Sequence, residues 1–140
     1  MTSRIKFILR ILMAGVFIGA SLPKIMASHD FALAIFRYHL MPDGLINITA
    51  MVLPCLEIVA AVAIILPRWR TAGTIWLVSM LAISTLAIAS ALLRGLDIDC
   101  GCFTLKPGQS VIGWSHVLRN LFLMGILVWV GMPEPFVSKR

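Results

Sequence analysis

Charged side chains are scarce in this sequence. They make up 13% of its 140 residues, whereas soluble domains carry roughly 25%. Hydrophobic residues make up 60% of the chain, and its mean hydropathy is +0.98. A water-soluble protein of this length could not bury so much apolar surface. The composition therefore predicts an integral membrane protein, folded as a single domain over residues 1–140.

The sequence also lacks internal repeats and long stretches in which polar and apolar residues alternate. The missing alternation argues against a membrane β-barrel. Lys and Arg do not cluster with aromatic residues, as they do on surfaces that bind nucleic acids. They gather instead at the ends of apolar stretches, which is typical of membrane proteins. We therefore expect contact with membrane lipids and no nucleic-acid partner.

Four long apolar stretches predict an all-α membrane protein built as a four-helix bundle. The predicted transmembrane helices cover about residues 5–24, 47–66, 71–93 and 114–132, each close to the ~20 residues that a span needs. Apolar residues at helical spacing predict a short interfacial helix between the first two, starting at Ser28 and ending at Pro42. The basic first stretch also fits a signal peptide, but Pro23 and Lys24 stand where a cleavage site needs small neutral residues.

The distribution of basic residues predicts the orientation in the membrane, because Lys and Arg favour the cytoplasmic side. With four spans, both termini share one side. Seven basic residues would lie on that side: Arg4, Lys6, Arg10, Arg68, Arg70, Lys139 and Arg140. Four would lie on the other: Lys24, Arg37, Arg94 and Lys106. We therefore expect a bacterial inner-membrane protein with cytoplasmic termini and a periplasmic loop at residues 94–113, in a compartment that tolerates disulfides.

That loop carries the strongest chemical signal, Cys100-Gly101-Cys102. Gly101 lets the backbone bend enough for a strained disulfide between residues two apart, and strained exposed disulfides are labile. The pair fits a redox dithiol, a soft-metal site for copper or mercury, or two structural cysteines. Two cysteines without further ligands nearby make a poor zinc site. Asp99 adjoins Cys100, and a neighbouring carboxylate disfavours a thiolate.

Charged and thiol side chains also occur inside the predicted helices. Side chains tilt toward the start of their helix, so Lys24 would lean back into the membrane while Glu57 and Arg119 lean up toward the loop, and all three can converge just beneath it. Charges inside a membrane are costly and are usually paired or functional. These three therefore form either a structural ion pair or a group that serves the chemistry. Cys55 fits a small buried hydrophobic residue or a third thiol that relays or resolves a disulfide.

Taken in order, these features resemble a known family. The residues are Lys24, the segment Leu53-Pro54-Cys55-Leu56-Glu57, the segment Asp99-Cys100-Gly101-Cys102-Phe103, and Arg119-Asn120. They resemble the MauE-like branch of the DoxX family of four-helix, redox-associated membrane proteins, and the resemblance spans nearly the whole chain. It implies work with periplasmic thioredoxin-like partners, as in the maturation of disulfide-rich enzymes. It also implies that Cys100 and Cys102 are the family's cysteine pair and that Glu57 and Arg119 are its membrane-buried charges.

The sequence thus leads to one main hypothesis and two alternatives. Cys100 and Cys102 would carry out thiol–disulfide exchange with a periplasmic thioredoxin-like partner, while Glu57, Arg119 and Lys24 tune the thiols or hold a cofactor. A membrane quinone is the expected electron partner, because no haem or flavin motif is visible. The alternatives are a protein that handles copper or mercury and a non-catalytic subunit that anchors a partner enzyme.

Overall fold

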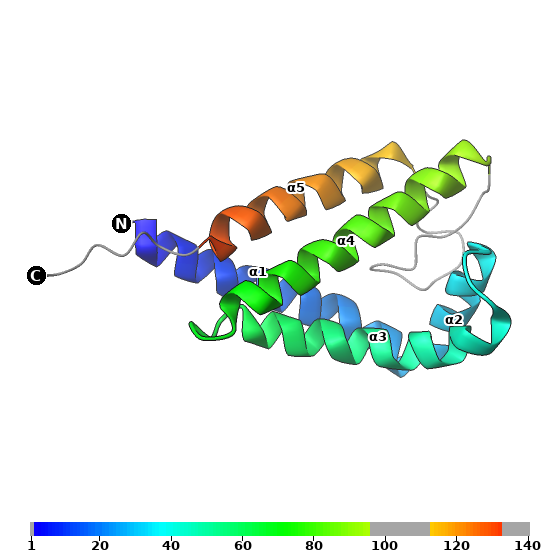
Figure 1. Ribbon diagram of the computed structural model, residues 1–140, viewed down its shortest axis with the longest axis horizontal. Coiled ribbons are helices and arrows are strands. Elements are labelled where there is room, and N and C mark those ends of the chain that lie inside the picture. The colour runs from blue at the N-terminus through cyan, green and yellow to red at the C-terminus, as the bar shows by residue number, and fades with distance from the viewer. Residues whose placement is uncertain (1, 96–112, 133–140) are drawn as a thin grey trace, which may run out of the picture.

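The computed structural model describes residues 2–95 and 113–132, which form five helices and no strands (Figure 1). The helices are α1 (Thr2–Met26), α2 (Ser28–Arg37), α3 (Asp43–Ala63), α4 (Arg70–Leu93) and α5 (Trp114–Gly131). Four of them, α1, α3, α4 and α5, are long and apolar enough to cross a membrane. The predicted fold class is therefore confirmed. Asp99, Cys100 and Cys102 lie outside the described residues.

The four long helices pack in a ring, in which α1 contacts α3 and α5, and α4 contacts the same two helices. The short helix α2 packs on α3 and α1. It lies at the end of the bundle opposite the start of α1, and α3 and α4 diverge toward that end (Figure 1). The described chain stops at Gly95 and resumes at Gly113 at this same end, where Arg94 donates a hydrogen bond of 2.9 Å to the carbonyl of Tyr38.

The second long helix is shifted from its predicted bounds of 47–66. It begins at Asp43 because Pro42 has extended backbone angles and occupies the cap position, and because an acidic residue suits the first turn. It ends at Ala63, shortly before Pro67, whose ring disfavours helix in the residue before it. The prediction relied on apolar residues alone and so missed a polar but helical first turn.

The short helix is present, but both of its predicted end signals are wrong. Ala27, not Ser28, occupies the cap position, and Ser28 is already helical. The helix ends at Arg37, and Pro42 precedes α3 instead of terminating α2. Phe31 and Ala32 pack on Ile46 and Ala50, so α2 covers the first turns of α3. The apolar face predicted for this segment therefore faces the protein.

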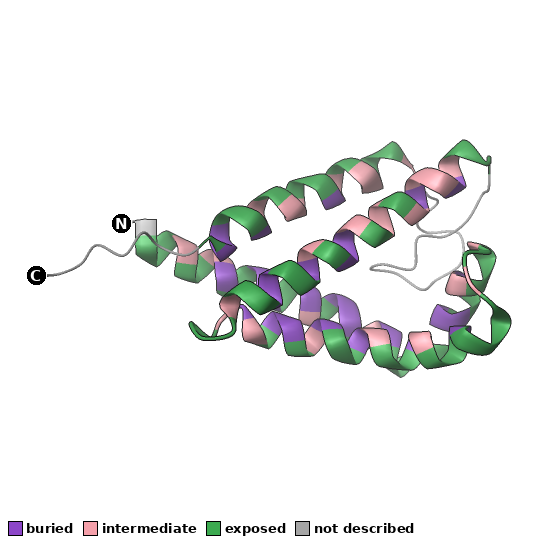
Figure 2. Cartoon of the chain, in the orientation of Figure 1, coloured by how far each residue is buried: buried purple, intermediate pink, exposed green. Residues whose placement is uncertain are grey.

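The main core lies between the four long helices. Its buried members are Met13, Ala14, Phe17, Ala60, Ala61, Ile64, Leu77, Leu81 and Leu127. Figure 2 shows buried residues lining the inner faces of the helices and exposed residues along their outer faces. Many exposed residues are large and apolar, such as Ile83 and Leu86 on α4. An apolar outer surface of this kind suits a lipid environment.

Small residues let helices approach closely in two places. A Cβ atom at Gly73 on α4 would lie 2.9 Å from the carbonyl oxygen of Ala60 on α3. A Cβ atom at Gly131 on α5 would lie well inside contact distance of the Thr74 side chain on α4. Small residues at helix contacts are typical of membrane bundles, where van der Waals packing replaces the hydrophobic effect between helices.

Candidate functional site

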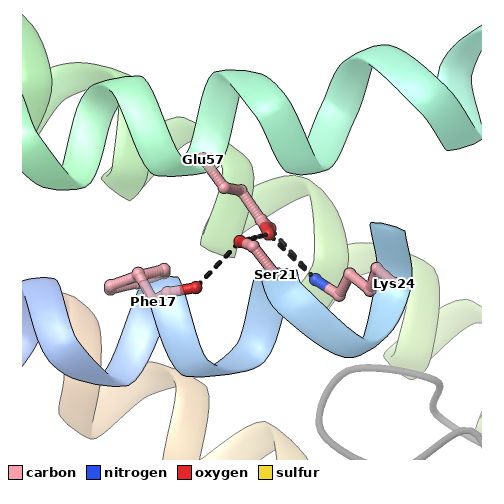
Figure 3. A network of polar contacts seen from close by, with 4 residues as sticks. All are labelled: Phe17, Ser21, Lys24 and Glu57. Carbon is pink, nitrogen blue, oxygen red and sulfur yellow. Dashed lines mark hydrogen bonds and ion pairs between the residues drawn. The ribbon is translucent and has the colours of Figure 1, made fainter. Parts of the chain in front are cut away.

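A buried ion pair joins α1 to α3. The Lys24 ammonium lies 3.0 Å from Oε2 and 3.2 Å from Oε1 of Glu57 (Figure 3). The two side chains are only 8% and 10% exposed. Two of the three charged residues that the sequence predicts to converge are thus in direct contact. Removing two charges from water is expensive, and their mutual attraction and hydrogen bonds offset that cost only in good geometry.

Ser21 completes the network and was missed by the sequence prediction. Its hydroxyl oxygen lies 2.7 Å from Glu57 Oε2 and 2.8 Å from the carbonyl oxygen of Phe17 (Figure 3). A serine hydroxyl has one hydrogen to donate, so it serves one acceptor at a time, and the carboxylate is the stronger acceptor. The signal was present in the sequence, because Ser21 precedes Lys24 by three residues and so shares its helix face.

Lys24 is buried although it lies only two residues from the end of α1. The reason is that α3 begins about 21 Å before Glu57, fourteen residues away, and so extends past the end of α1. The helix α2 packs on that extension, and the Phe31 ring centroid lies 5.3 Å from the Lys24 ammonium. This distance allows a cation–π interaction. Lys24 is therefore enclosed by three helices.

A small cavity of about 40 Å³ lies beside the ion pair, lined in part by Lys24, Glu57, Ser84 and Asn120. Asn120 is 2% exposed, and its amide nitrogen has no hydrogen-bond partner among the residues that the structure describes. The cavity exceeds the ~10–15 Å³ that one water needs, and its polar lining could hold one. Arg119, the adjacent position on α5, does not line this cavity. Its predicted role stays a prediction.

A larger cavity of about 220 Å³ lies on the other side of the pair, between α2, α3 and α4. Lys24, Glu57 and Ser84 line both cavities, so the ion pair lies between them. The rest of the larger lining is mainly apolar, with Tyr38 and Thr49 as further polar members. The arrangement offers a buried donor and a buried acceptor to a small molecule at the α2 end of the bundle.

Of the two interpretations of Cys55, the buried hydrophobic residue is wrong, and the third thiol that relays or resolves a disulfide stays a prediction. Cys55 is exposed on the surface of α3, and its thiol lies 3.4 Å from the carbonyl oxygen of Met51. Pro54 and Glu57 face inward from the same helix. Cys55 lies about 100° around the helix from Pro54, which turns it toward the lipid.

Within residues 2–95 and 113–132, no three side chains of His, Cys, Asp or Glu come together as a metal site would need. The soft-metal alternative thus concerns Cys100 and Cys102, which lie outside these ranges. The described part of the site consists of Lys24, Glu57, Ser21 and the two cavities beside them. Its chemistry is that of hydrogen bonding and charge pairing in an apolar surround.

Comparison with known proteins gives consistent matches. A family model described as methylamine utilisation protein MauE matches residues 2–133. A protein of Methylophilus methylotrophus named methylamine utilization protein MauE is 34% identical over 118 residues, covering 84% of this chain and 62% of the relative. The protein of that name in Paracoccus denitrificans is 32% identical over 128 residues, covering 89% of this chain and 68% of the relative. The one in Paracoccus versutus is 34% identical over 120 residues, covering 85% and 64%.

The chain therefore spans 62–68% of the length of these three relatives. No solved structure gives a significant match.

Proposed function

Because the chain belongs to the MauE family, we propose that it is a membrane thiol–disulfide redox protein. In this proposal Cys100 and Cys102 exchange electrons with a periplasmic thioredoxin-like partner, and a membrane quinone is the second electron partner. The protein would lie in the bacterial inner membrane with cytoplasmic termini. The wider relationship to the DoxX family, which the sequence motifs suggest, is part of the same proposal.

One observation carries this proposal: the buried polar group and both attachment points of the cysteine segment lie at the same end of the bundle. Lys24 is near the end of α1, and the described chain stops at Gly95 and resumes at Gly113 at that end. Cys100 is the fifth residue after Gly95, and an extended chain of that length spans at most about 18 Å. We therefore propose that the cysteine pair works at this end of the bundle, above the cavities.

The proposed exchange conserves atoms and electrons. A thiolate of the pair attacks a partner disulfide, forming a mixed disulfide and releasing one partner thiolate. The neighbouring thiol then displaces the second partner sulfur, leaving a reduced partner and a Cys100–Cys102 disulfide. In the opposite direction the partner becomes oxidised and the pair becomes a dithiol. A quinone, when bound, would take the two electrons and two protons of that dithiol and become a quinol.

Trapping the mixed disulfide tests the exchange. With Cys102 as the attacking thiol, Cys100→Ser should accumulate a covalent adduct with a soluble thioredoxin-like protein, because the thiol that resolves it is gone. Asp99 favours this assignment, since it adjoins Cys100 and disfavours that thiolate. Non-reducing gels of membranes, followed by mass spectrometry of the adduct, provide the measurement. Cys102→Ser should trap much less.

Two controls make the trapping experiment specific. Cys55→Ser, which keeps both loop cysteines, should accumulate no adduct, and the Cys100→Ser/Cys102→Ser variant should lose the adduct entirely. If neither single variant traps a partner and the purified protein holds about one Cu(I) per chain through these sulfurs, the soft-metal function replaces the exchange function. Retained partner binding in the double variant, without any adduct in the single variants, would instead favour the anchor function.

Thiol labelling tests the proposed orientation, which rests on the seven-to-four bias of basic residues. In a Cys55→Ser background, a membrane-impermeant maleimide applied to reduced spheroplasts should label Cys100 or Cys102. Ser3→Cys is the control for the cytoplasmic side. The cysteine at this position should stay unlabelled by the same reagent until the inner membrane is broken. Labelling of the loop cysteines only after breakage would contradict the periplasmic orientation.

A further inference from the structure

The larger cavity has the composition of a small-molecule site rather than of a packing defect. Apolar side chains dominate its lining, and a few polar groups come together at one side, as is typical of ligand pockets. Lys24 and Glu57 come from different helices, α1 and α3, and Ser84 comes from α4. A cavity left by poor packing of lipid-facing helices would have no reason to enclose a buried ion pair.

The size of the cavity fits one six-membered ring with substituents. Its volume is about 220 Å³, whereas an apolar cavity of roughly 150 Å³ in another protein is known to bind benzene. The Phe31 side chain lines the cavity and offers an aromatic surface. A ring of this size would therefore fit between α2 and α4 without moving the helices.

The polar side of the cavity offers both a donor and an acceptor. An ammonium has three N–H donors, and the two hydrogen bonds of Lys24 to Glu57 use at most two of them. The Glu57 carboxylate can accept further hydrogen bonds. A ring carbonyl would accept from Lys24, and the hydroxyl formed on its reduction would donate to Glu57. Lys24 and Glu57 thus complement both redox forms of the same ring. A hydrocarbon chain could form neither of these hydrogen bonds.

The cavity also reaches the lipid-facing surface. Ile83 lines it and is 67% exposed on the outer face of α4. A ligand with a long apolar tail could therefore place its ring against the ion pair while its tail remains in the bilayer.

We propose that this cavity binds the ring of a lipid-soluble quinone, with Lys24 donating a hydrogen bond to a ring carbonyl. This inference deepens the proposed function, because it assigns a site to the quinone that would accept electrons from the cysteine pair. The proposal does not depend on the thiols, however, since the residues that form the site belong to α1, α2, α3, α4 and the connection between α2 and α3.

Equilibrium binding tests the site separately from the exchange chemistry. The Cys100→Ser/Cys102→Ser variant in lipid nanodiscs is titrated calorimetrically with decylubiquinone, and empty nanodiscs give the partitioning background. We expect saturable binding of one quinone per chain. Decylbenzene, which has a ring and tail but no carbonyl, should bind at least about tenfold more weakly, because it cannot accept a hydrogen bond from Lys24.

Cavity-filling variants localise the binding. Ala87→Leu on α4 and Thr49→Leu on α3 both place added bulk in the cavity and should each raise the dissociation constant at least about tenfold. Ala72→Leu is the matched control, because Ala72 is exposed on α4 and does not line the cavity. It should bind like the parent. Using two filling variants on different helices guards against one that fails to fold.

Three results would overturn the site: no binding above empty nanodiscs, equal binding of decylbenzene, or unchanged affinity in both filling variants. Failure of the site and failure of the exchange can be told apart. A trapped thioredoxin-like adduct without quinone binding would leave the thiol–disulfide exchange with the partner standing and remove this quinone site. Quinone binding without any trapped adduct would support this site and remove the exchange with a thioredoxin-like partner.

Discussion

Glu57→Gln is expected to lower the free energy of unfolding by about 3–5 kcal/mol, because it leaves the buried Lys24 ammonium without its counter-charge. The Lys24 side chain is only 8% exposed, so little bulk water reaches it to relieve this cost. Ser21 also loses a charged acceptor for its hydroxyl. Unfolding in mixed micelles with increasing denaturing detergent provides the measurement.

The double variant Lys24→Met/Glu57→Gln should recover most of the lost stability. Replacing both partners of a buried ion pair removes the desolvation cost along with the attraction, and the exchange is often neutral or stabilising. The matched control is Asp43→Asn, which removes an exposed carboxylate from the first turn of the same helix. It should change stability by less than about 1 kcal/mol, through the helix dipole alone.

This series separates a structural role from a chemical one. A Glu57→Gln variant with unchanged stability but lost adduct formation or quinone binding would place Glu57 in the chemistry. If Glu57→Gln changes neither stability, exchange nor quinone binding, the ion pair has neither the structural nor the chemical role.

Gly73→Ala is expected to destabilise the bundle by about 1–3 kcal/mol, because overpacking forces neighbouring atoms to move. The new methyl group would lie 2.9 Å from the Ala60 carbonyl oxygen and 3.0 Å from the Ile64 backbone nitrogen. Both are backbone atoms of the α3 segment, so α3 and α4 must separate to accept it. The same unfolding measurement reports the loss.

Gly125→Ala is the matched control for Gly73→Ala. It makes the same chemical change inside α5, where nothing lies within 4 Å of the added carbon. Alanine is the better helix former by about 1 kcal/mol, so this variant should be neutral or slightly more stable. Equal stability of the two variants would show that α3 and α4 do not depend on their close approach at Gly73.

The four spans could be predicted from the sequence because each is long, apolar and separated from the next by polar residues, Gly or Pro. The contact between Lys24 and Glu57 was also foreseeable, since two opposite charges in a bilayer have few other ways to lower their energy. Helix direction and side-chain tilt were sufficient to bring these residues toward the same depth.

The direction that a side chain faces could not be predicted where a helix is apolar all around. The helix α3 has apolar residues on its core face and on its lipid face, so periodicity gives no reason to turn Cys55 outward. The prediction that Pro42 ends the short helix failed for a different reason. A proline marks a boundary in either direction, and only the three-dimensional structure shows that it begins α3 instead of ending α2.

Because α3 and α4 approach closely at Gly73, a small change in their crossing angle there would move the far end of α4. Ile88, which lines the larger cavity, lies fifteen residues further along α4, about 22 Å from Gly73 along the helix axis. Over that length, a rotation of α4 by about 3° about Gly73 moves Ile88 by about 1 Å. A change in the packing at Gly73 would therefore alter the width of the cavity, although Gly73 does not line it. Such a change would adjust which ring sizes the cavity accepts while every residue that touches the ligand stays the same.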